Sequence, residues 1–274
     1  MSGHDIAIKV SDLSKCYQIY DKPSDRLKQF IVPKLCRAIP ALRNSFPTPH
    51  LPLPPYYRDF WALKNVSLEI KKGETVGIIG RNGSGKSTLL QMICGTLSPS
   101  NGSIHTIGRI AALLELGAGF NPEFTGQENV RMGCALLGLT PEETEAKFDD
   151  IAAFADIGDF IEQPVRIYSS GMYVRLAFAL NIASEPDIMI VDEALAVGDM
   201  SFQAKCMTAL ARIQERGATI LFVSHDIGAL KSLCSRGVYL EHGTVQEIGT
   251  AGDVAEHYIR RMREEMNAKF TATQ

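Results

Sequence analysis

Short apolar runs separated by longer amphipathic stretches mark most of the chain. Three runs are almost free of charged and strongly polar side chains, which predicts strands buried on both faces: residues 75–79, 188–191 and 220–223. Helical periodicity lies around them, at residues 86–94, 170–183 and 201–215. Because strands and helices alternate, the pattern predicts an α/β fold with a mostly parallel sheet and right-handed crossovers.

Further strands are predicted near both ends of this alternating region. Residues 5–10 resemble a first strand, and residues 61–70 alternate apolar and polar positions as a half-buried strand does. Residues 237–248 predict a closing hairpin with its turn at His242-Gly243.

Two helices are predicted by the residues that begin them. Thr140 opens a capping box with proline at the next position, which predicts a helix to about Phe154. Thr250 and Asp253 have the spacing of a helix cap, and they predict a final helix that runs to about Ala268.

Residues 18–60 differ in composition from the rest of the chain and look like an insertion into a compact domain. Within them, SDRLKQFIV predicts a short helix with Ser24 as its N-cap and with Leu27, Phe30 and Ile31 on one face. The proline density elsewhere favours an extended path, since eight of the 13 prolines lie here: 23, 33, 40, 47, 49, 52, 54 and 55.

This insertion is locally basic. Between residues 24 and 55 it contains one acidic residue, Asp25, and five basic residues: Arg26, Lys28, Lys34, Arg37 and Arg43. Two interpretations stay open. It is a solvated loop, or it faces the membrane and handles an anionic lipid head group or a pyrophosphate-linked glycan.

Composition and charge exclude several classes of protein. With 45% hydrophobic and 22% charged residues the chain is globular and not disordered. Its net charge of −3 is not that of a dedicated nucleic-acid binder, so we expect no nucleic-acid partner. No apolar run is long enough to span a bilayer, and the start shows no secretion signal. The six cysteines are scattered without a C-x-x-C pair, which indicates free thiols in a reducing, cytosolic compartment.

A phosphate-binding loop connects the first buried strand to the helix that follows it. The sequence GRNGSGKS matches the P-loop pattern at every fixed position, and its strand–loop–helix setting is the one that the motif requires. Backbone N–H groups and the helix N-terminus would face the phosphates, Lys86 would reach the β- and γ-phosphates of ATP, and Ser87 would ligate Mg²⁺. The expected contacts are Gly80, Arg81, Asn82, Gly83, Ser84, Gly85, Lys86, Ser87 and Thr88.

Polar side chains follow the other two buried strands. Asp192 ends the run IMIV and would hold Mg²⁺, and Glu193 beside it would be the general base that activates the attacking water. His225 follows the run ILFV at the same edge of the sheet, where we expect a contact with the γ-phosphate.

The order of P-loop, YSSGM, VDE and SHD resembles the nucleotide-binding subunits of ABC transporters. In that family a Ser/Gly motif at a helix N-terminus seals the ATP of the opposite subunit, so the resemblance implies an ATP-dependent homodimer. Ser169 and Gly171 match the usual LSGGQ motif, whereas Ser170 replaces a glycine and Met172 replaces the glutamine. Asp199 matches the family's aspartate at the dimer interface.

Other matches narrow the resemblance. TGQEN, YSSGM followed by RLAFAL, and VDEALAVGD are similar to the ATPase subunits of O-antigen and other lipid-linked polysaccharide exporters. Glu115 stands where that family usually has a glutamine that senses Mg²⁺ and the permease. Tyr17 matches the aromatic residue that stacks on the base. Phe60 and Trp61 lie nearer to the P-loop in the sequence, but Trp61 begins a strand and is expected in the core.

The resemblance implies an α/β P-loop NTPase of ABC type with a mostly parallel core sheet, an antiparallel β subdomain and a helical subdomain near residues 118–180. It makes residues 1–274 one ATPase domain, with a helix and tail at about 250–274 and without the C-terminal carbohydrate-binding β-sandwich of some family members. Its cofactors would be ATP and Mg²⁺.

The implied function is ATP hydrolysis that drives two copies of a transmembrane permease at the cytoplasmic face of the bacterial inner membrane, to export lipid-linked polysaccharide. Capsule and teichoic-acid exporters are near relatives and stay open. A soluble, non-transport ABC ATPase is an alternative of another class, but such proteins usually carry two cassettes or a long coiled coil. A non-hydrolysing regulatory cassette would be expected to lack Glu193 or His225, and both are present.

Overall fold

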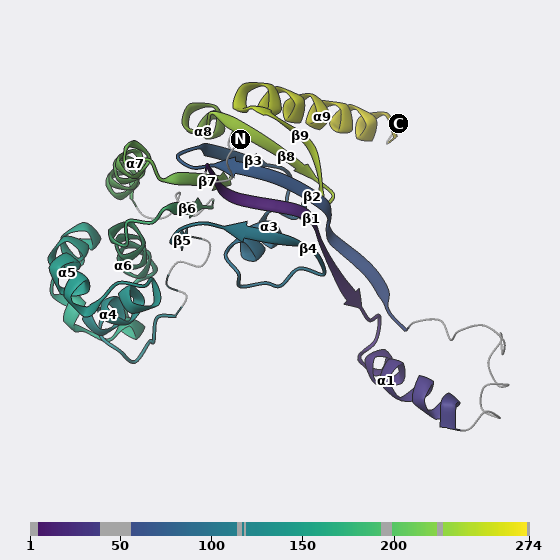
Figure 1. Ribbon diagram of the computed structural model, residues 1–274, viewed down its shortest axis with the longest axis horizontal. Coiled ribbons are helices and arrows are strands. Elements are labelled where there is room, and N and C mark those ends of the chain that lie inside the picture. The colour runs from purple at the N-terminus through teal and green to yellow at the C-terminus, as the bar shows by residue number, and fades with distance from the viewer. Residues whose placement is uncertain are drawn as a thin grey trace.

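Two β-sheets and the helices packed on them organise the chain in the computed structural model (Figure 1), which describes residues 5–38, 56–113, 117, 119–192, 199–223 and 227–272. The larger sheet has the strand order β5-β6-β7-β3-β8-β9, and every neighbouring pair except β8 and β9 is parallel. Its strands are β3 (Thr75–Ile79), β5 (Ile110–Ala112), β6 (Ile188–Val191), β7 (Thr219–Val223), β8 (Arg236–Glu241) and β9 (Thr244–Thr250).

The three apolar runs that predicted buried strands form the centre of this sheet. Every residue of β3, β6 and β7 is buried, because helices or the second sheet cover both faces. The predicted hairpin is confirmed as β8 and β9, and His242 and Gly243 have positive φ angles of 48° and 76° in its turn.

The second sheet is antiparallel, with the order β2-β1-β4: β1 (Ile6–Ile19), β2 (Arg58–Lys71) and β4 (Asn101–Thr106). β1 is far longer than the strand predicted at residues 5–10. Its last five residues, 15–19, are exposed or only partly buried, and they are held by pairing with β2, where Cys16 pairs with Trp61 and Ile19 with Arg58. A hydrophobic pattern cannot reveal such a segment, because neither face is buried.

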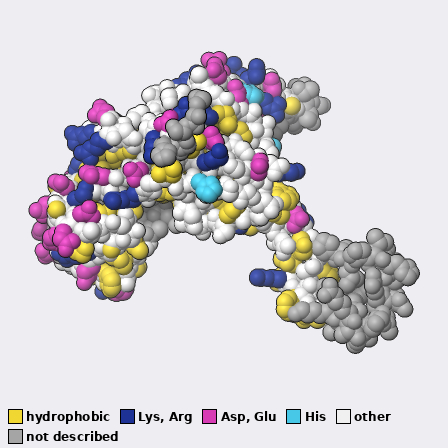
Figure 2. Space-filling model, viewed as in Figure 1, with side chains coloured by type: hydrophobic (Ala, Val, Ile, Leu, Met, Phe, Trp, Pro, Cys, Tyr) yellow, Lys and Arg dark blue, Asp and Glu magenta, His cyan; other side chains and the backbone are white. Residues whose placement is uncertain are grey.

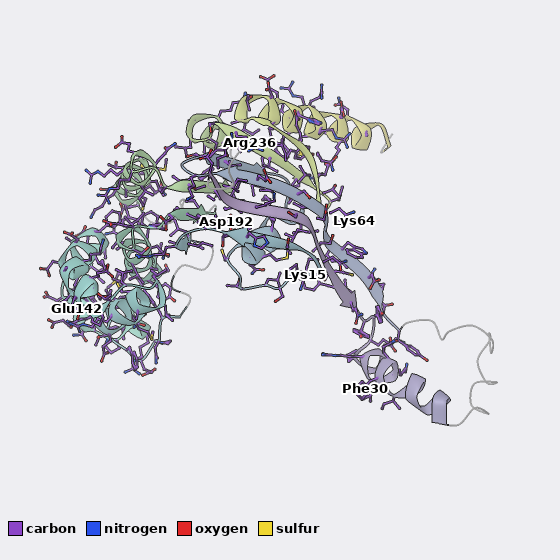
Figure 3. All side chains as sticks on the ribbon, viewed as in Figure 1. Lys15, Phe30, Lys64, Glu142, Asp192 and Arg236 are labelled. Carbon is purple, nitrogen blue, oxygen red and sulfur yellow. The ribbon has the colours of Figure 1, made fainter. Side chains whose placement is uncertain are left out.

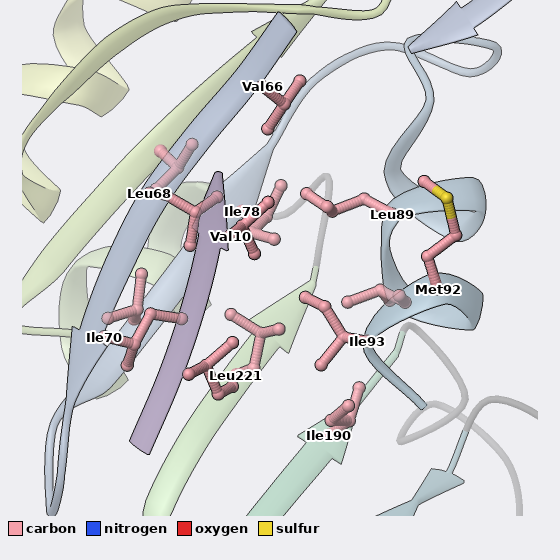
Figure 4. Close-up of a cluster of buried hydrophobic side chains, with 14 of the residues drawn as sticks. Val10, Val66, Leu68, Ile70, Ile78, Leu89, Met92, Ile93, Ile190 and Leu221 are labelled. Atoms are coloured by element: carbon pink, nitrogen blue, oxygen red, sulfur yellow. The ribbon is translucent and has the colours of Figure 1, made fainter. Parts of the chain in front are cut away.

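The main core lies between the two sheets, and α3 (Lys86–Ile93) closes it (Figure 4). Leu13, Val66, Ile78 and Leu89 are all completely buried there. The opposite face of the larger sheet packs against four helices: α6 (Ser170–Ala183), α7 (Met200–Glu215), α8 (Ile227–Leu233) and α9 (Ala251–Ala272). The P-loop therefore joins a strand and a helix that are both anchored in this core.

A helical subdomain projects beside the sheets (Figure 1) and consists of α4 (Gly126–Leu136), α5 (Pro141–Ala155) and α6, joined by 3-10 turns at Gly158–Glu162 and Val165–Ile167. The capping box predicted at Thr140 is confirmed, since Thr140 and Glu143 bond to each other's backbone N–H groups. The subdomain has its own apolar core, with Val130, Ile151 and Leu176 at its centre.

The insertion contains one described helix, α1 (Pro23–Ala38), which stands at the end of a two-stranded extension of β1 and β2, away from the sheets (Figure 1). We call the distal part of these strands and α1, residues 14–38 and 56–61, the arm. The prediction of Ser24 as N-cap is wrong. The helix already includes Pro23, whose fixed φ suits the first helical position, so Ser24 lies inside the helix.

Hydrophobic side chains lie exposed on the arm, as Figure 2 shows in yellow around α1. Leu27 and Phe30 are 62% and 65% exposed. Trp61 was predicted in the core, but this prediction is wrong, because it lies on the extended part of β2 and is 41% exposed. The prolines from 40 to 55 lie outside the described residues.

Other predictions concern the final helix, the thiols and membrane spans. α9 is capped by Thr250 as predicted, since its hydroxyl accepts the Asp253 N–H, and the helix continues to Ala272. Five of the six cysteines, Cys16, Cys94, Cys134, Cys206 and Cys234, have free thiols. Within the described ranges, no helix has both the length and the apolar character needed to cross a membrane.

Candidate functional site

The P-loop wraps the N-terminus of α3 in a backbone path that only glycine allows at its tightest points. Gly85 caps the helix at a φ of 104°, and a Cβ there would stand 2.6 Å from the Ala62 carbonyl oxygen. A Cβ on Gly80 would lie 2.2 Å from the Leu240 oxygen at the end of β8. Gly83, with a φ of 81°, instead borders open space. The loop is therefore packed tightly against the protein at its two ends and open in the middle.

Lys86 is folded inward over this loop. Its side chain is 8% exposed, and Nζ donates hydrogen bonds to the carbonyl oxygens of Gly80, at 2.6 Å, and Arg81, at 3.0 Å. The Ser84 hydroxyl is also buried in the loop, and within the described part of the chain it has no hydrogen-bond partner. Positive charge and hydrogen-bond donors are thus concentrated where the helix N-terminus already favours an anion.

A pocket of about 440 Å³ opens over the P-loop. The aromatic rings of Tyr17 and Phe60, which face each other across β1 and β2, line one part of it. The remaining lining residues are Ala62, Asn82, Gly83, Gly85, Lys86, Ser87, Thr88 and Asp192. Figure 3 marks Asp192, which follows the last residue of β6. The structure therefore brings predicted residues from three separate segments, Tyr17, the P-loop and Asp192, into one cavity.

Mg²⁺ and ATP fit this set of side chains. Hydroxyl and carboxylate oxygens, present in Ser87 and Asp192, are the ligands that Mg²⁺ prefers. An ammonium group and a helix N-terminus suit phosphates, and aromatic rings suit a purine base.

Phe60 also lines the pocket, although the sequence favoured Tyr17 over it as the aromatic residue that stacks on the base. The signal was available in principle, because Phe60 pairs directly with Tyr17 across the two strands, so both side chains lie on the same face. That pairing could not be known before the register of the two strands was known.

Three residues predicted at the site lie outside the described residues: Glu115, Glu193 and His225. Their places in the site remain predictions.

The Ser/Gly motif lies elsewhere. Ser169 caps α6, and its hydroxyl accepts the Met172 N–H at 3.2 Å. Ser169 and Ser170 are exposed, and a Cβ on Gly171 would meet nothing closer than 3.9 Å. None of the three lines the pocket over the P-loop. They form an open helix N-terminus that is not part of the chain's own pocket.

Asp199 is held close to the same helix. It caps α7 by accepting the Phe202 N–H at 2.9 Å, and it pairs with Arg175 of α6. The backbone hydrogen bond from Phe202 and the Arg175 guanidinium hold the pKa of Asp199 below its usual range, so it is an anion at neutral pH. Arg175 was not singled out in the sequence, because the two partners are 24 residues apart and no local pattern connects them.

A buried strand, a glycine-rich loop and a helix N-terminus with an inward lysine define a P-loop nucleotide-binding protein. The profile of the ABC transporter family matches residues 63–196. RfbB, an O-antigen export system ATP-binding protein of Klebsiella pneumoniae, is 41% identical over 256 residues, which are 93% of this chain and 98% of that protein. TagH, a teichoic acids export ATP-binding protein of Listeria monocytogenes, is 39% identical over 256 residues, which are 93% and 70% of the two chains.

A solved dimeric ATP-binding cassette in a post-hydrolysis state with ADP and phosphate has the same fold. Its TM-score is 0.66 at 23% identity, over 89% of this chain and 98% of that chain. The chain belongs to the family of ABC transporter ATP-binding proteins, and it is an ATP hydrolase of that family.

Proposed function

We propose that this chain is the ATP-hydrolysing subunit of an exporter that moves lipid-linked, O-antigen-type polysaccharide across the bacterial inner membrane, from a peripheral position on the cytoplasmic side. One observation carries the proposal: the similarity to the O-antigen export protein RfbB extends over 93% of the chain and 98% of that protein. A teichoic-acid exporter is the second candidate, because TagH is similar over the same share of the chain.

In this proposal the pocket positions ATP and compensates its charge. Lys86 leaves its two carbonyl partners for phosphate oxygens, and the N–H groups around Gly83 complete the cradle. Ser87 and Asp192 hold Mg²⁺, which neutralises charge on the phosphates. Glu193 takes the proton of the attacking water and His225 contacts the γ-phosphate.

A second copy of the chain completes each site. The exposed helix N-terminus at Ser169 has a free approach and a dipole suited to a γ-phosphate, yet it does not reach the pocket of its own chain. A homodimer on ATP would place it over the partner's P-loop, with Asp199 nearby at the interface. The solved cassette with this fold is itself dimeric.

The dimer can be tested with two inactive variants. Lys86→Ala damages the P-loop and Ser169→Arg blocks the shared motif. A crosslinked mixed dimer of the two has one intact composite site, so it is expected to hydrolyse ATP although both homodimers are inactive. Full activity of the Ser169→Arg protein alone would reject the role of YSSGM.

A docking surface for a permease lies between the helical subdomain and the core. A mainly apolar cavity of about 280 Å³ is bordered by α3 and β5 on one side and by α4 and α6 on the other. Leu136, at its rim, is 72% exposed. An apolar hollow between two subdomains can receive a short helix of a permease. Each of the two cassettes would then bind one of two permease copies.

The arm is the part that we assign to the membrane side. α1 presents exposed Leu27, Phe30 and Ile31 with Arg26 and Lys28 on the same short helix, a mixture suited to lipid head groups and anionic, lipid-linked glycans. The alternative is a solvated spacer.

Purification of the tagged chain from detergent-solubilised membranes tests the exporter assignment. We expect a permease to co-purify, and we expect Glu193→Gln expressed in place of the wild type to abolish surface polysaccharide. A chain recovered without a membrane partner, from cells with normal surface polysaccharide, would favour a soluble ABC ATPase. Loss of teichoic acid in place of O-antigen would favour the second candidate.

A further inference from the structure

We propose that Glu265, on the C-terminal helix α9, is a positioning residue for the ATP site: it pairs with the P-loop residue Arg81 and thereby sets the affinity of the loop for nucleotide. The proposal rests on ATP binding by the P-loop.

One face of α9 carries the contacts. The helix packs along β8 and β9, where Val254 and Ala255 are completely buried and the Tyr258 ring stands 5.5 Å from that of Tyr239. Arg261 and Glu265 follow Tyr258 at intervals of three and four residues, so all three lie on this face. α9 is therefore fixed by an apolar contact at its start and presents two opposite charges further along.

Arg261, the first of these charged residues, binds the β8–β9 hairpin, which contacts the P-loop. Arg261 pairs with Glu241 at 3.6 Å, and the Tyr239 hydroxyl donates to the same carboxylate at 2.7 Å. Glu241 is only 8% exposed, so it depends on these partners. The turn that follows it donates the Gly243 N–H to the Ser84 carbonyl oxygen at 3.0 Å. The end of β8 and the P-loop thus form one packed unit.

The second charge reaches the P-loop itself. The Arg81 guanidinium pairs with the Glu265 carboxylate, 184 residues away in the chain. Arg81 is absent from the residues that line the pocket, whereas its neighbours Asn82 and Gly83 do line it. Glu265 therefore draws the arginine side chain out of the nucleotide pocket and toward α9.

The backbone of Arg81 connects this contact to the phosphate site. Its carbonyl oxygen accepts the Ser84 N–H at 3.1 Å and a hydrogen bond from Lys86 Nζ at 3.0 Å. A change in where Arg81 is held moves an atom that orients the Lys86 ammonium. Both side chains of the ion pair are partly exposed, at 45% and 32%, so the pair adds little to folding stability, and its effect falls on the loop.

A double-substitution cycle on the full chain tests the proposal: Arg81→Gln, Glu265→Gln and both together, with the Kd for Mg-ADP measured by titration calorimetry. We expect each single change to raise Kd about fivefold and the double change to raise it about fivefold as well, since the second change removes nothing further. The kcat of Glu265→Gln at saturating ATP is expected to stay nearly unchanged, so that the effect of this change falls on nucleotide affinity. A Kd within twofold of wild type for Glu265→Gln, or an additive rise of about 25-fold in the double variant, would overturn the proposal.

Two further variants separate the possible failures. Glu256→Gln is the matched control on α9, because it removes an exposed carboxylate that pairs with Lys231 and not with the P-loop, and its Kd is expected to equal that of wild type. An equal rise in Kd for this control, or a lowered unfolding midpoint of Glu265→Gln with unchanged Kd, would overturn the positioning role alone. Normal Mg-ADP binding by Lys86→Ala would instead overturn the ATP site on which the proposal rests.

Discussion

The nucleotide-binding core and the arm are held together in opposite ways. In the core, Ile78 and Leu89 flank the P-loop and are completely buried. In the arm, Leu27 and Phe30 are more than half exposed, and backbone pairing of β1 with β2 supplies the main support. The Gln29 side chain accepts the Tyr56 N–H at 2.8 Å, and the rings of Tyr20 and Tyr57 stand 5.7 Å apart.

This difference separates the apolar surface that the chain buries in order to fold from the apolar surface that it leaves available for contacts with other molecules. The apolar side chains of the core are buried within it, and nucleotide binding there depends on backbone positions that this packing fixes. The α1 helix of the arm leaves apolar surface unused by folding, so changes on this helix are expected to spare the ATP site and to affect only its contacts with other molecules. Four predictions test this separation.

The largest effect is expected in the core, from Glu193→Gln. The amide keeps the shape of the side chain but cannot take a proton from water, so kcat is expected to fall by about 10²–10⁴ while ATP binding persists. An ATPase assay measures the loss, and size-exclusion chromatography with ATP is expected to show an accumulated dimer. Near-normal turnover would remove Glu193 from the role of general base.

A pair of truncations compares the stability of the two regions. Ile78→Ala removes a completely buried side chain from the main core and is expected to lower the free energy of unfolding by about 2–5 kcal/mol. Phe30→Ala removes a side chain that is 65% exposed and is expected to cost less than about 0.5 kcal/mol. Urea unfolding of both variants gives the comparison. A large loss for Phe30→Ala would show that the arm is part of the folding core.

Replacement of Arg26, Lys28, Lys34 and Arg37 with serine tests whether the arm acts outside the ATP site. ATPase activity in detergent without substrate is expected to stay near that of wild type, and polymer export in membranes is expected to fall severalfold, because the basic charge for an anionic head group is lost. Normal export at the usual expression level would make the arm a spacer.

The smallest effect is expected where the two regions meet. Tyr17→Ala removes one ring of the aromatic pair in the pocket and is expected to raise the KM for ATP about three- to tenfold, whereas Tyr17→Phe keeps the ring and most of the affinity. Trp61→Ala is the control, since Trp61 does not line the pocket. An equal rise in KM for Tyr17→Ala and Trp61→Ala would reject base stacking on Tyr17.

The same two regions explain what the sequence could and could not predict. Helix α6 was predicted at its observed bounds, and the P-loop was placed between its strand and helix, because buried periodicity and a local motif define both. The length of β1 and the exposure of Trp61 were missed, because the arm's strands lack a buried face. The partner of Arg81 could not be found either, since Glu265 is joined to it only by the packing of α9.

One continuous strand joins the two regions. Tyr17 of the pocket and Pro23 at the start of α1 are six residues apart, and β1 carries the chain from the main core to the arm. In thermodynamic terms, a ligand on α1 that displaced Tyr17 would change the affinity for ATP by a certain factor. ATP would then change the affinity of α1 for that ligand by the same factor, because coupling between two binding sites is reciprocal. The change in either affinity caused by the other ligand therefore gives the same coupling free energy between the two sites.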